Sequence, residues 1–290
     1  MSCRRGHVLR IRDVLYAVTV IVSSHDVRLH VHARPDGFWE RFDSGTWEPW
    51  TLRVLAERLR PGARYIDIGA WIGPTVLAAA AAGALVEGFE PDPGALPELR
   101  ANLDANPRLA QRVTIHPVAL AATRASRMLF FWGDAGDSMS SLVHRARSAS
   151  EGALVNVEPI RDWLGRPAFD AADLIKIDIE GGEYELIPAM HAYLARKRPD
   201  LLLSMHAYQL AGQIDRLARS GVPRRIAAHG LVLSERLKIG WLAKDYLHVY
   251  VARGNDWQPV DRQTWRRLLH VPEDCDLFFS DQQLRQRSAT

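Results

Sequence analysis

Hydrophobic and polar positions along the chain follow one pattern up to residue 60 and another beyond it. In the first part, two apolar runs rich in β-branched residues, Val8–Val22 and Val27–Val31, flank a short polar stretch, which is typical of a β-hairpin. An aromatic-rich connector at 37–50 then leads into a predicted helix at Thr51–Leu59, which Pro61-Gly62 ends. We therefore expect an N-terminal β-hairpin appendage ahead of a larger unit.

Beyond Gly62, short apolar strands alternate with helices, as in βαβ units with a parallel sheet. Strands are predicted at 64–69, 84–89, 113–118, 173–179 and 200–206, and helices at 74–82, 94–105, 183–196 and 208–219. The segments 224–235 and 245–253 predict an antiparallel strand pair that closes the sheet. The sequence thus predicts a doubly wound α/β fold with a mostly parallel sheet of seven strands.

Two parts of the chain do not fit this simple alternation. The stretch 119–172 is longer than one crossover, and its strand-like segments 128–132 and 154–157 predict an insertion on one side of the sheet. The last residues are mixed in character. We divide the chain into a hairpin with its connector at 1–50, an α/β domain at 51–255 and a C-terminal tail at 256–290.

Composition gives little evidence for a charged partner. The 290 residues are 47% hydrophobic and carry a formal charge of +3, with a sequence pI near 9.0. Only four of the 37 basic residues are lysine, and the basic residues form no Lys/Arg run of the kind that binds phosphates. We interpret the high pI as a bias toward arginine and expect no nucleic-acid partner.

Cysteines and apolar runs bear on the compartment. Cys3 and Cys275 lie near opposite ends of the chain and predict neither a disulfide framework nor a zinc site. The apolar run Val14–Val22 has about half of the ~20 residues that a membrane-spanning helix needs. The sequence therefore predicts no membrane segment and a cytoplasmic location.

A glycine-rich turn follows the first predicted strand of the α/β domain. Asp67 ends the strand, Gly69 and Gly73 form the turn, and Pro74 suits the first position of the next helix. Glycine lets backbone N–H groups approach a ligand, and the N-terminus of the helix adds partial positive charge. Glu90 ends the next strand, where an acid can bind both hydroxyls of a ribose.

These residues favour S-adenosylmethionine over a nicotinamide cofactor. The dinucleotide fingerprint G-x-G-x-x-G is missing from the turn. The carboxylate of Asp67 would repel a pyrophosphate, but it suits the amino group of a methionine moiety. A purely structural strand-turn-helix is the alternative, and the position of Glu90 argues against it.

A second group of polar residues ends the fourth predicted strand. Lys176, Asp178 and Glu180 alternate with isoleucines, so one face of a buried strand carries three charges. We expect Lys176 to neutralise Asp178, and we expect Asp178 and Glu180 to act on a ligand at the carboxyl end of the strand. The next strand ends in His206, for which a structural role and a role as base stay open.

With these motifs, the sequence resembles the FkbM family of S-adenosylmethionine-dependent methyltransferases. The resemblance rests on the turn IDIGAWIG, on FEP after the second strand, on the helix ELRANLDAN and above all on IKIDIEGGEYEL followed by a strand that ends in histidine. It extends from residue 45 to 252, with Glu48 at the place of an acid that the family has before its first strand. It implies a class I methyltransferase sheet and O-methylation of a hydroxyl on a sugar or a polyketide-type product.

The predicted cofactor-binding residues for S-adenosyl-L-methionine are Glu48, Asp67, Gly69, Gly73, Glu90, Asn102, Ser141 and Asp178. His206 is the first candidate for the base that removes the proton of the acceptor, with Asp178 and Glu180 as alternatives. A divalent metal held by Asp178 and Glu180 stays open, because hard cations favour carboxylates. No clean spacing of metal ligands demands one, so we assign no metal site. The sequence departs from the family at Trp71 in the turn and at Ser204, where many members have an acid.

The acceptor follows less directly from the sequence. Trp39, Trp47 and Trp50 precede the α/β domain, and they either stack on the faces of a sugar or pack the appendage onto the core. We favour packing. The predicted partner is a small-molecule acceptor, and a homodimer is left open. Methylation of a carboxyl group or of nucleic acid, and a non-catalytic S-adenosylmethionine-binding role, are the alternatives.

Overall fold

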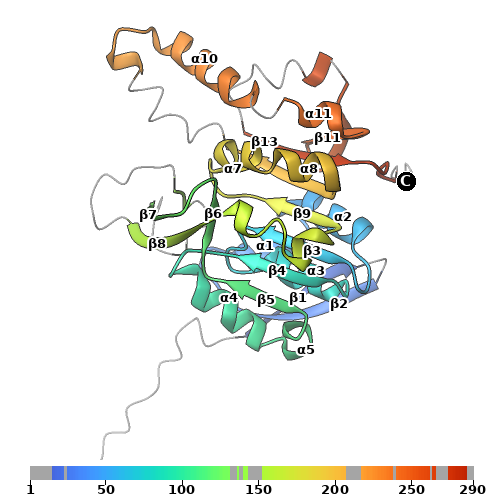
Figure 1. Ribbon diagram of the computed structural model, residues 1–290. Helices are drawn as coiled ribbons and strands as arrows, with labels where there is room; N and C mark the ends of the chain where they lie inside the picture. The colour runs from blue at the N-terminus through green and yellow to red at the C-terminus, as the bar shows by residue number, and fades with distance from the viewer. Residues whose placement is uncertain are drawn as a thin grey trace, which may run out of the picture.

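The computed structural model describes residues 15–22, 25–130, 136, 140–142, 152–206, 217–237, 240–261, 263–265 and 274–285. They form an α/β fold around one large, mostly parallel sheet (Figure 1). The predicted fold class is confirmed, but the sheet has eight strands rather than the predicted seven. A two-stranded and a three-stranded sheet lie outside it.

Five parallel strands form the centre of the large sheet, and three antiparallel strands extend one edge. The parallel strands are, in spatial order, β10 (Asp200–Met205), β9 (Leu174–Ile177), β3 (Arg64–Ile68), β4 (Leu85–Phe89) and β5 (Val113–His116). The antiparallel strands are β13 (Cys275–Ser280), which pairs with β10, then β11 (His248–Arg253) and β12 (Asp256–Pro259). The order reverses between β3 and β9, so their carboxyl ends form the switch point where open α/β sheets bind ligands.

The closing strands differ from the prediction in one respect. The segment 224–235, predicted as a strand, forms the helix α10 (Arg224–Leu237), so that prediction is wrong. Ala227, Ala228 and Leu231 all pack against the same core cluster. Positions i, i+1 and i+4 share one face of a helix, whereas adjacent residues of a strand point to opposite faces. The place beside β10 is taken by β13, which comes from the segment 256–290 that we expected as a tail.

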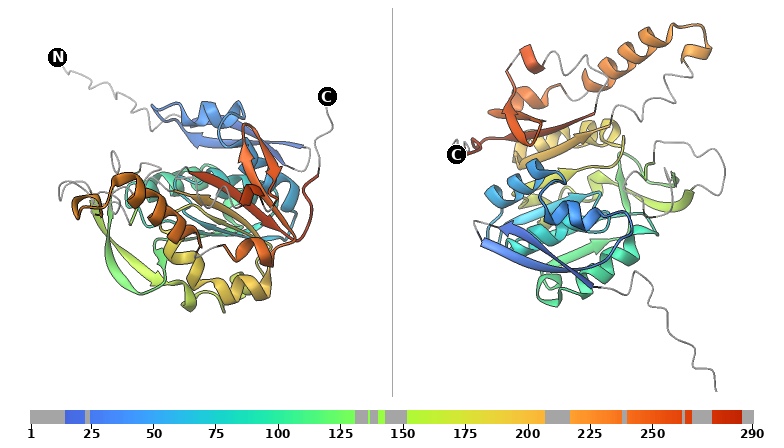
Figure 2. Two further views of the ribbon diagram at one scale, coloured as in Figure 1. Left: turned by 90° about the horizontal axis from the view of Figure 1, so that it is seen from above. Right: turned by 180° about the vertical axis from the view of Figure 1, so that it is seen from behind.

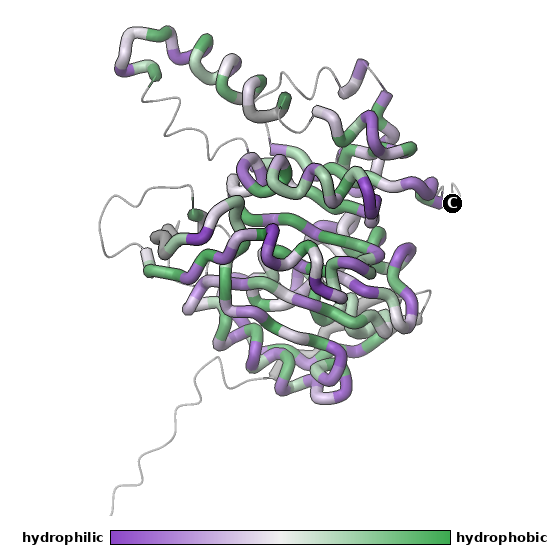
Figure 3. The backbone as a smooth tube through the Cα atoms, in the orientation of Figure 1, coloured by the Kyte–Doolittle hydropathy of each residue, from purple (hydrophilic) through white to green (hydrophobic). Residues whose placement is uncertain are grey.

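Alternate residues of the strands face two separate hydrophobic layers. Tyr65 and Leu174 pack in one layer, and their neighbours Ile66 and Ile175 pack in the other. Helices on the first side are α2 (Pro49–Arg58), α3 (Pro74–Ala81), α4 (Ala95–Asp104) and α5 (Pro107–Ala110), and on the second side α6 (Pro167–Asp170), α7 (Glu183–Ala189) and α8 (His191–Lys197). The strands of the large sheet, which lie between these two layers, are rich in hydrophobic residues (Figure 3).

The helix predicted at 183–196 forms as two shorter helices, α7 and α8, which meet at Met190. Pro188 lies in the last turn of α7. Proline has no N–H to donate, and its ring clashes with the carbonyl group of the preceding turn. α7 therefore ends one residue after Pro188, at Ala189.

The predicted N-terminal hairpin is confirmed as β1 (Leu15–Val22), which pairs antiparallel with β2 (His25–His32). It lies with α1 (Phe38–Asp43) over the helices of the first layer (Figure 2). Two side chains of these helices bind β2, because Asn102 accepts a hydrogen bond from the N–H of His32 and Asn106 accepts one from the N–H of His30. The hairpin is thereby attached to α4 through Asn102 and to the start of α5 through Asn106.

The insertion predicted at 119–172 contains a small sheet. Its strands are β6 (Ala119–Ala121), β8 (Gly152–Pro159) and β7 (Ala125–Phe130), followed by the 3-10 helix η2 (Ile160–Asp162). A short helix, α11 (Leu242–Asp245), precedes β11. The helix predicted at 208–219 lies outside the described residues except for 217–219, which are helical. In the described part of the chain, no helix is both long and apolar enough to cross a membrane.

Candidate active site

A cavity of about 360 Å³ lies at the carboxyl ends of β3, β4, β9 and β10. The start of α2, the glycine turn, the loops after β4 and β9, and residues of β10 and β13 all contribute to its lining. Six predicted site residues line it, namely Glu48, Gly69, Glu90, Asp178, Glu180 and His206. Asp67, Gly73, Asn102 and Ser141 are not among its lining residues, so the structure brings together only part of the predicted set.

The glycine turn brings the ends of β3 and β9 into contact. Gly69 has a φ of 95°, and a side-chain carbon there would lie 1.8 Å from the carbonyl oxygen of Asp178, so only glycine fits. Gly73 has a φ of 91°, and a side-chain carbon there would lie 2.4 Å from Leu99 Cδ1. Both glycines are therefore required by the shape of the turn, one beside the cavity and one at the start of α3.

Asp67 lies under the turn, with its side chain fully buried. It accepts a 2.5 Å hydrogen bond from Thr75 Oγ1 and lies 3.6 Å from Nζ of Lys176. Burial raises the pKa of Asp67, whereas Lys176 and Thr75 favour its ionised form. Asp67 therefore connects the glycine turn to the charged residues of β9.

The carboxylate of Glu90 is fixed at the end of β4 by two backbone N–H groups. Those of Trp71 and Asp92 each donate to it at 2.7 Å. Burial raises the pKa of Glu90 to about 7, although the two hydrogen bonds favour the ionised form. A carboxylate held in this way at the cavity wall can accept hydrogen bonds from the two hydroxyls of a ribose.

Asn102 and Ser141 hold backbone segments beside the cavity. The buried side chain of Asn102 donates to the carbonyl oxygen of Ile72 in the glycine turn, and it accepts from His32 of the hairpin. The hydroxyl of Ser141 donates to the carbonyl oxygen of Glu180. Their observed contacts are thus with the protein, and a contact with the cofactor stays a prediction.

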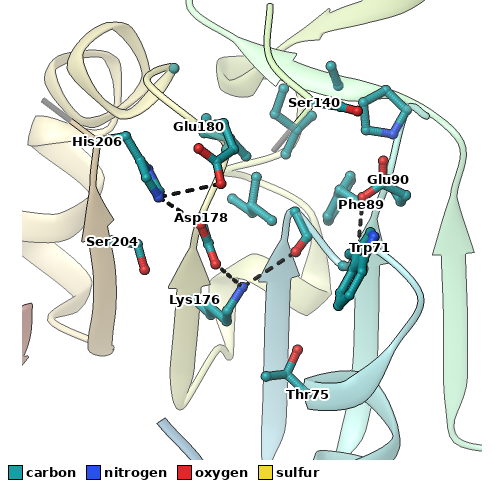
Figure 4. A pocket seen from close by; sticks show the side chains of 18 of the residues that line it. Trp71, Thr75, Phe89, Glu90, Ser140, Lys176, Asp178, Glu180, Ser204 and His206 are labelled. Atoms are coloured by element: carbon teal, nitrogen blue, oxygen red, sulfur yellow. Dashed lines mark hydrogen bonds and ion pairs between the residues drawn. The ribbon is translucent and has the colours of Figure 1, made fainter. Parts of the chain in front are cut away.

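Charged side chains form a continuous series from Asp67 through Lys176 and Asp178 to His206. Figure 4 shows the part of this series from Lys176 to His206. Lys176 is buried and lies 3.1 Å from Asp178 Oδ2 as well as 3.6 Å from Asp67 Oδ1, so the predicted pairing of Lys176 with Asp178 is confirmed. Burial opposes the charge of Lys176, but Asp178 and Asp67 hold its pKa well above the ordinary value. Lys176 and His206 in turn hold the pKa of Asp178 below its usual range in spite of burial.

His206 lies among three carboxylates. Its Nδ1 is 3.0 Å from Glu183 Oε1, and its Nε2 is 3.6 Å from both Asp178 Oδ1 and Glu180 Oε1. Burial by itself would lower the pKa of His206, but the charge and hydrogen bond of Glu183, followed by the charges of Asp178 and Glu180, raise it to about 11. At neutral pH, His206 is therefore an imidazolium that donates hydrogen bonds.

Glu183 is not among the predicted site residues, although it orders this corner of the cavity. Its Oε1 accepts a 2.9 Å hydrogen bond from the N–H of Ile179, and its Oε2 accepts one of 2.8 Å from the N–H of Gly181. These bonds hold the loop that carries Glu180. In the sequence, Glu183 belongs to the motif IKIDIEGGEYEL, which is the signal that could have marked it. An acid in the first turn of a helix is also a common structural feature, so Glu183 was not assigned to the site.

Other lining residues come from segments that the sequence did not assign to the site. Asp274 and Asp276 line the cavity because β13 lies beside β10. Trp47 and Trp50 also line it, whereas Trp39 is buried in an aromatic cluster of the appendage. Trp47 and Trp50 pack against the same core, Trp47 on Phe38 and Phe42, so the packing that we favoured holds for all three tryptophans. Trp47 and Trp50 in addition lie where an acceptor could contact them.

Three of the lining residues have a left-handed backbone without being glycine. They are Glu48, Trp71 and Glu180, with φ values of 37°, 48° and 53°. Such conformations cost on the order of 1–3 kcal/mol each and are concentrated at functional sites. Their occurrence on three separate elements around one cavity is independent evidence that this cavity is the functional site.

One cluster in the cavity wall has the composition of a metal site. The ligand atoms of Asp178, Glu183 and His206 lie within 4.8 Å of one another. Both oxygens of Glu183 already accept hydrogen bonds from the backbone, and its Oε1 is paired with His206 Nδ1. The cluster is satisfied by these internal contacts, and we assign no metal to it.

The residues present fit S-adenosylmethionine. The volume of the cavity is within the range of small-molecule sites, roughly 300–1,000 Å³. Glu90 offers a fixed carboxylate for a ribose. Glu48 offers a buried oxygen, Oε2, that has no hydrogen-bond partner among the described residues and can accept a hydrogen bond from the amino group of the methionine moiety.

A comparison with protein families also indicates a methyltransferase. A family model described as the methyltransferase FkbM domain matches residues 67–221, which is more than half of the chain. A sequence comparison with curated proteins gives no match.

Several solved structures resemble the fold at low identity. Methyltransferase FkbM from Methylobacillus flagellatus is 18% identical over 83% of this chain, with a TM-score of 0.41, and the chain spans 55% of that protein. The O-methyltransferase TomG from Streptomyces achromogenes, which is involved in tomaymycin synthesis and was solved with S-adenosylmethionine, is 14% identical, with a TM-score of 0.40 and coverage of 79% of this chain and 78% of that one. Precorrin-6y C5,15-methyltransferase from Geobacter metallireducens is 15% identical, with a TM-score of 0.36 and coverage of 80% and 87%. The chain belongs to the FkbM family of S-adenosylmethionine-dependent methyltransferases.

Proposed function

We propose that the protein transfers a methyl group from S-adenosylmethionine to a hydroxyl group of a small molecule, of the sugar or polyketide type. One observation carries this proposal. The carboxylates of Asp178 and Glu180 line the same cavity as Gly69 and Glu90, so groups that can accept a proton adjoin the residues expected to hold the cofactor. When bound, the cofactor supplies an electrophilic methyl group.

The chain provides binding and orientation on one side of the cavity. Glu90 accepts hydrogen bonds from the ribose hydroxyls, and Glu48 accepts one from the amino group of the methionine moiety. Gly69 leaves the backbone of the turn open to close approach by a ligand. Much of the rate in methyl transfer comes from such positioning, because the acceptor oxygen must lie directly behind the methyl carbon.

The other side of the cavity removes the proton of the acceptor. An alcohol is a weak nucleophile, so a base must take its proton as the oxygen attacks the methyl carbon. The raised pKa of His206 shifts our preference from this histidine to Glu180. Asp178 is held by Lys176 at 3.1 Å, which makes it the weaker base of the two carboxylates. In this scheme the His206 imidazolium orients Glu180 and Asp178 by charge.

Calorimetry with S-adenosylmethionine, S-adenosylhomocysteine and NADH tests the cofactor. We expect both adenosylated compounds to bind and NADH not to bind. A methylation screen against hydroxylated natural products, with the same compounds in carboxylated form, then tests the acceptor group. If NADH binds and neither adenosylated compound does, the proposed cofactor is wrong. If methyl groups are transferred only to the carboxylated compounds, the proposed methylation of hydroxyl groups is wrong.

A further inference from the structure

Among the residues that the structure describes, carboxyl groups outnumber cationic groups in the lining of the cavity. Seven carboxyl groups line it, from Glu48, Glu90, Asp178, Glu180, Glu185, Asp274 and Asp276. The cationic side chains in the lining are Lys176 and His206, and none of the described arginines contributes. The protein as a whole has a net positive charge, so the acidic character of the cavity is a local feature.

Both cations are already engaged by acids. Lys176 lies between Asp67 and Asp178, and Asp67 itself is outside the cavity lining. His206 lies within 3.6 Å of three carboxylates, one of which, Glu183, is also outside the lining. Lys176 and His206 also favour the ionised form of Asp276, and Lys176 that of Glu48, but these two cations are shared among the seven carboxyl groups of the lining.

Asp276 is the best defined of the remaining acids. Its Oδ1 accepts a 2.7 Å hydrogen bond from the hydroxyl of Ser204, its partner across the β10–β13 pair, and this donor carries no charge. Burial raises the pKa of Asp276 and the negative charge of Asp178 adds to this, whereas the hydrogen bond from Ser204 and the charges of His206 and Lys176 lower it; the net shift is upward. The charge of Asp276 also contributes, after burial and Asp178, to the pKa of about 8 at Glu48. These acids destabilise one another's ionised forms, which a cation between them would reverse.

S-adenosylmethionine satisfies only part of this surplus. Its ammonium group is assigned above to Glu48, whereas Asp276 belongs to the β10–β13 end of the cavity, where the acceptor is expected. Trp47 and Trp50 line the cavity as well, and aromatic rings attract ammonium groups. β13 lies beyond the residues matched by the family model, so the family match does not include Asp276.

We propose that the acceptor carries an ammonium group as well as the hydroxyl that is methylated, and that Asp276 binds this ammonium group. The acceptor is then an amine-bearing, hydroxylated small molecule, such as an amino sugar. This inference rests on the proposed function, because it assigns the β13 side of the cavity to the acceptor. Anionic acceptors, such as phosphorylated or carboxylated sugars, are disfavoured by the same carboxyl groups.

Ligand-observed NMR at neutral pH tests the inference on the protein saturated with S-adenosylhomocysteine. The probes are D-glucosamine, D-glucose and N-acetyl-D-glucosamine, because the three sugars differ chiefly in the charged amine. We expect D-glucosamine to bind about tenfold or more tightly than the other two, the effect of one charge-assisted hydrogen bond. Asp276→Asn should abolish this preference, and Glu40→Gln, which removes one charge from an exposed position on α1, should preserve it.

The other outcomes overturn the proposal. Equal affinity for the three sugars, or no binding of any of them, excludes an ammonium site at Asp276 and leaves the proposed function standing when S-adenosylhomocysteine binds. Displacement of D-glucosamine by magnesium chloride, with magnesium affinity lost in Asp276→Asn, would assign the acids to a metal ion. Failure of S-adenosylhomocysteine to bind contradicts the proposed function. The affinities of the same three sugars for the protein without S-adenosylhomocysteine then test the ammonium site by themselves.

Discussion

Glu183 and His206 are joined by a 3.0 Å contact between Oε1 of the acid and Nδ1 of the imidazole. Glu183 is fully buried at the start of α7, and its carboxylate also accepts two backbone hydrogen bonds from the loop that follows β9. One side chain therefore fixes both the charge of His206 and the path of the loop that carries Glu180. This arrangement makes Glu183 a positioning residue whose removal should affect two measurable properties.

Glu183→Gln should lower the pKa of His206 from about 11 toward its ordinary value. The reason is that the negative charge of Glu183, which raises this pKa most, is lost. The substitution should also lower the free energy of unfolding by about 1–3 kcal/mol, since buried hydrogen bonds are weakened. NMR titration of the His206 ring and urea unfolding measure the two effects. Glu185→Gln makes the same exchange at an exposed position of α7 and should change neither. An unchanged His206 titration in Glu183→Gln would contradict this account.

The charge of His206 also predicts how stability depends on pH. Because the pKa of His206 is raised from 6.5 to about 11 on folding, the protonated form stabilises the folded protein fully below pH 6.5, and this contribution is lost as the pH rises toward 11. The difference in unfolding free energy between the wild type and His206→Gln should therefore shrink as the pH rises. Urea unfolding over a series of pH values measures it. A difference that grows with pH would show that His206 is neutral in the folded protein.

Lys176→Met should destabilise the protein by about 3–5 kcal/mol, because it leaves Asp67 and Asp178 buried without a cation. The matched control is Lys197→Met, which breaks the more exposed pair with Asp170 and should cost about 0–1 kcal/mol. Urea unfolding of both variants gives the comparison. Full stability of Lys176→Met together with lost activity would show instead that the lysine acts on the substrate.

The affinity for S-adenosylhomocysteine should depend on the ionisation of Glu90. Its pKa of about 7 in the free protein lies above the ordinary value because of burial, and the ionised form is the better acceptor for two ribose hydroxyls. Binding should therefore tighten as the pH rises through 7 and become constant above it. Glu90→Gln should weaken binding by about 1.5–3 kcal/mol and remove the pH dependence.

Isothermal titration calorimetry on both sides of neutrality measures this dependence. Glu87→Gln, on the same strand and outside the cavity lining, is the control and should bind as the wild type does. An unchanged dissociation constant in Glu90→Gln would remove Glu90 from the cofactor site.

Local sequence patterns were sufficient to predict the glycine turn after β3 and the ion pair on β9. The glycine turn after β3 depends on a positive φ at Gly69 and Gly73, and only glycine adopts it without strain. The alternation of Lys176 and Asp178 with isoleucines places both charges on one face of β9, so their pairing follows from strand geometry. Such features are determined by residues within a few positions of one another.

The side of the cavity formed by β10 and β13 depends on contacts between distant segments, which the sequence does not reveal. The segment 224–235 has enough β-branched and apolar residues to resemble a strand, but its burial pattern is set by packing as a helix. The sequence therefore gave no reason to place β13 beside β10, and Asp276 was missed. The ionisation of His206 likewise depends on Glu183, which lies 23 positions earlier in the chain.

The last prediction concerns the base, for which the sequence favours His206 and the structure favours Glu180. Removing a positioned general base lowers turnover by roughly 10²–10⁴-fold. We therefore expect a loss of this size in Glu180→Gln, measured with an acceptor identified by the methylation screen and at saturating S-adenosylmethionine. His206→Gln should retain more activity, because it removes an orienting charge and not the proton acceptor. Both variants should bind S-adenosylhomocysteine as the wild type does.

The pH dependence of turnover separates the two candidates further. If His206 were the base, turnover would rise through neutral pH and continue to rise toward its pKa of about 11, and the rise would disappear in His206→Gln. If Glu180 is the base, turnover does not follow the ionisation of His206, and the pH profile near neutrality is the same in the wild type and in His206→Gln. A wild-type level of activity in Glu180→Gln, with an inactive His206→Gln, would restore the histidine as base. Loss of activity with EDTA that magnesium restores would instead indicate that Glu180 and its neighbours act through a metal ion.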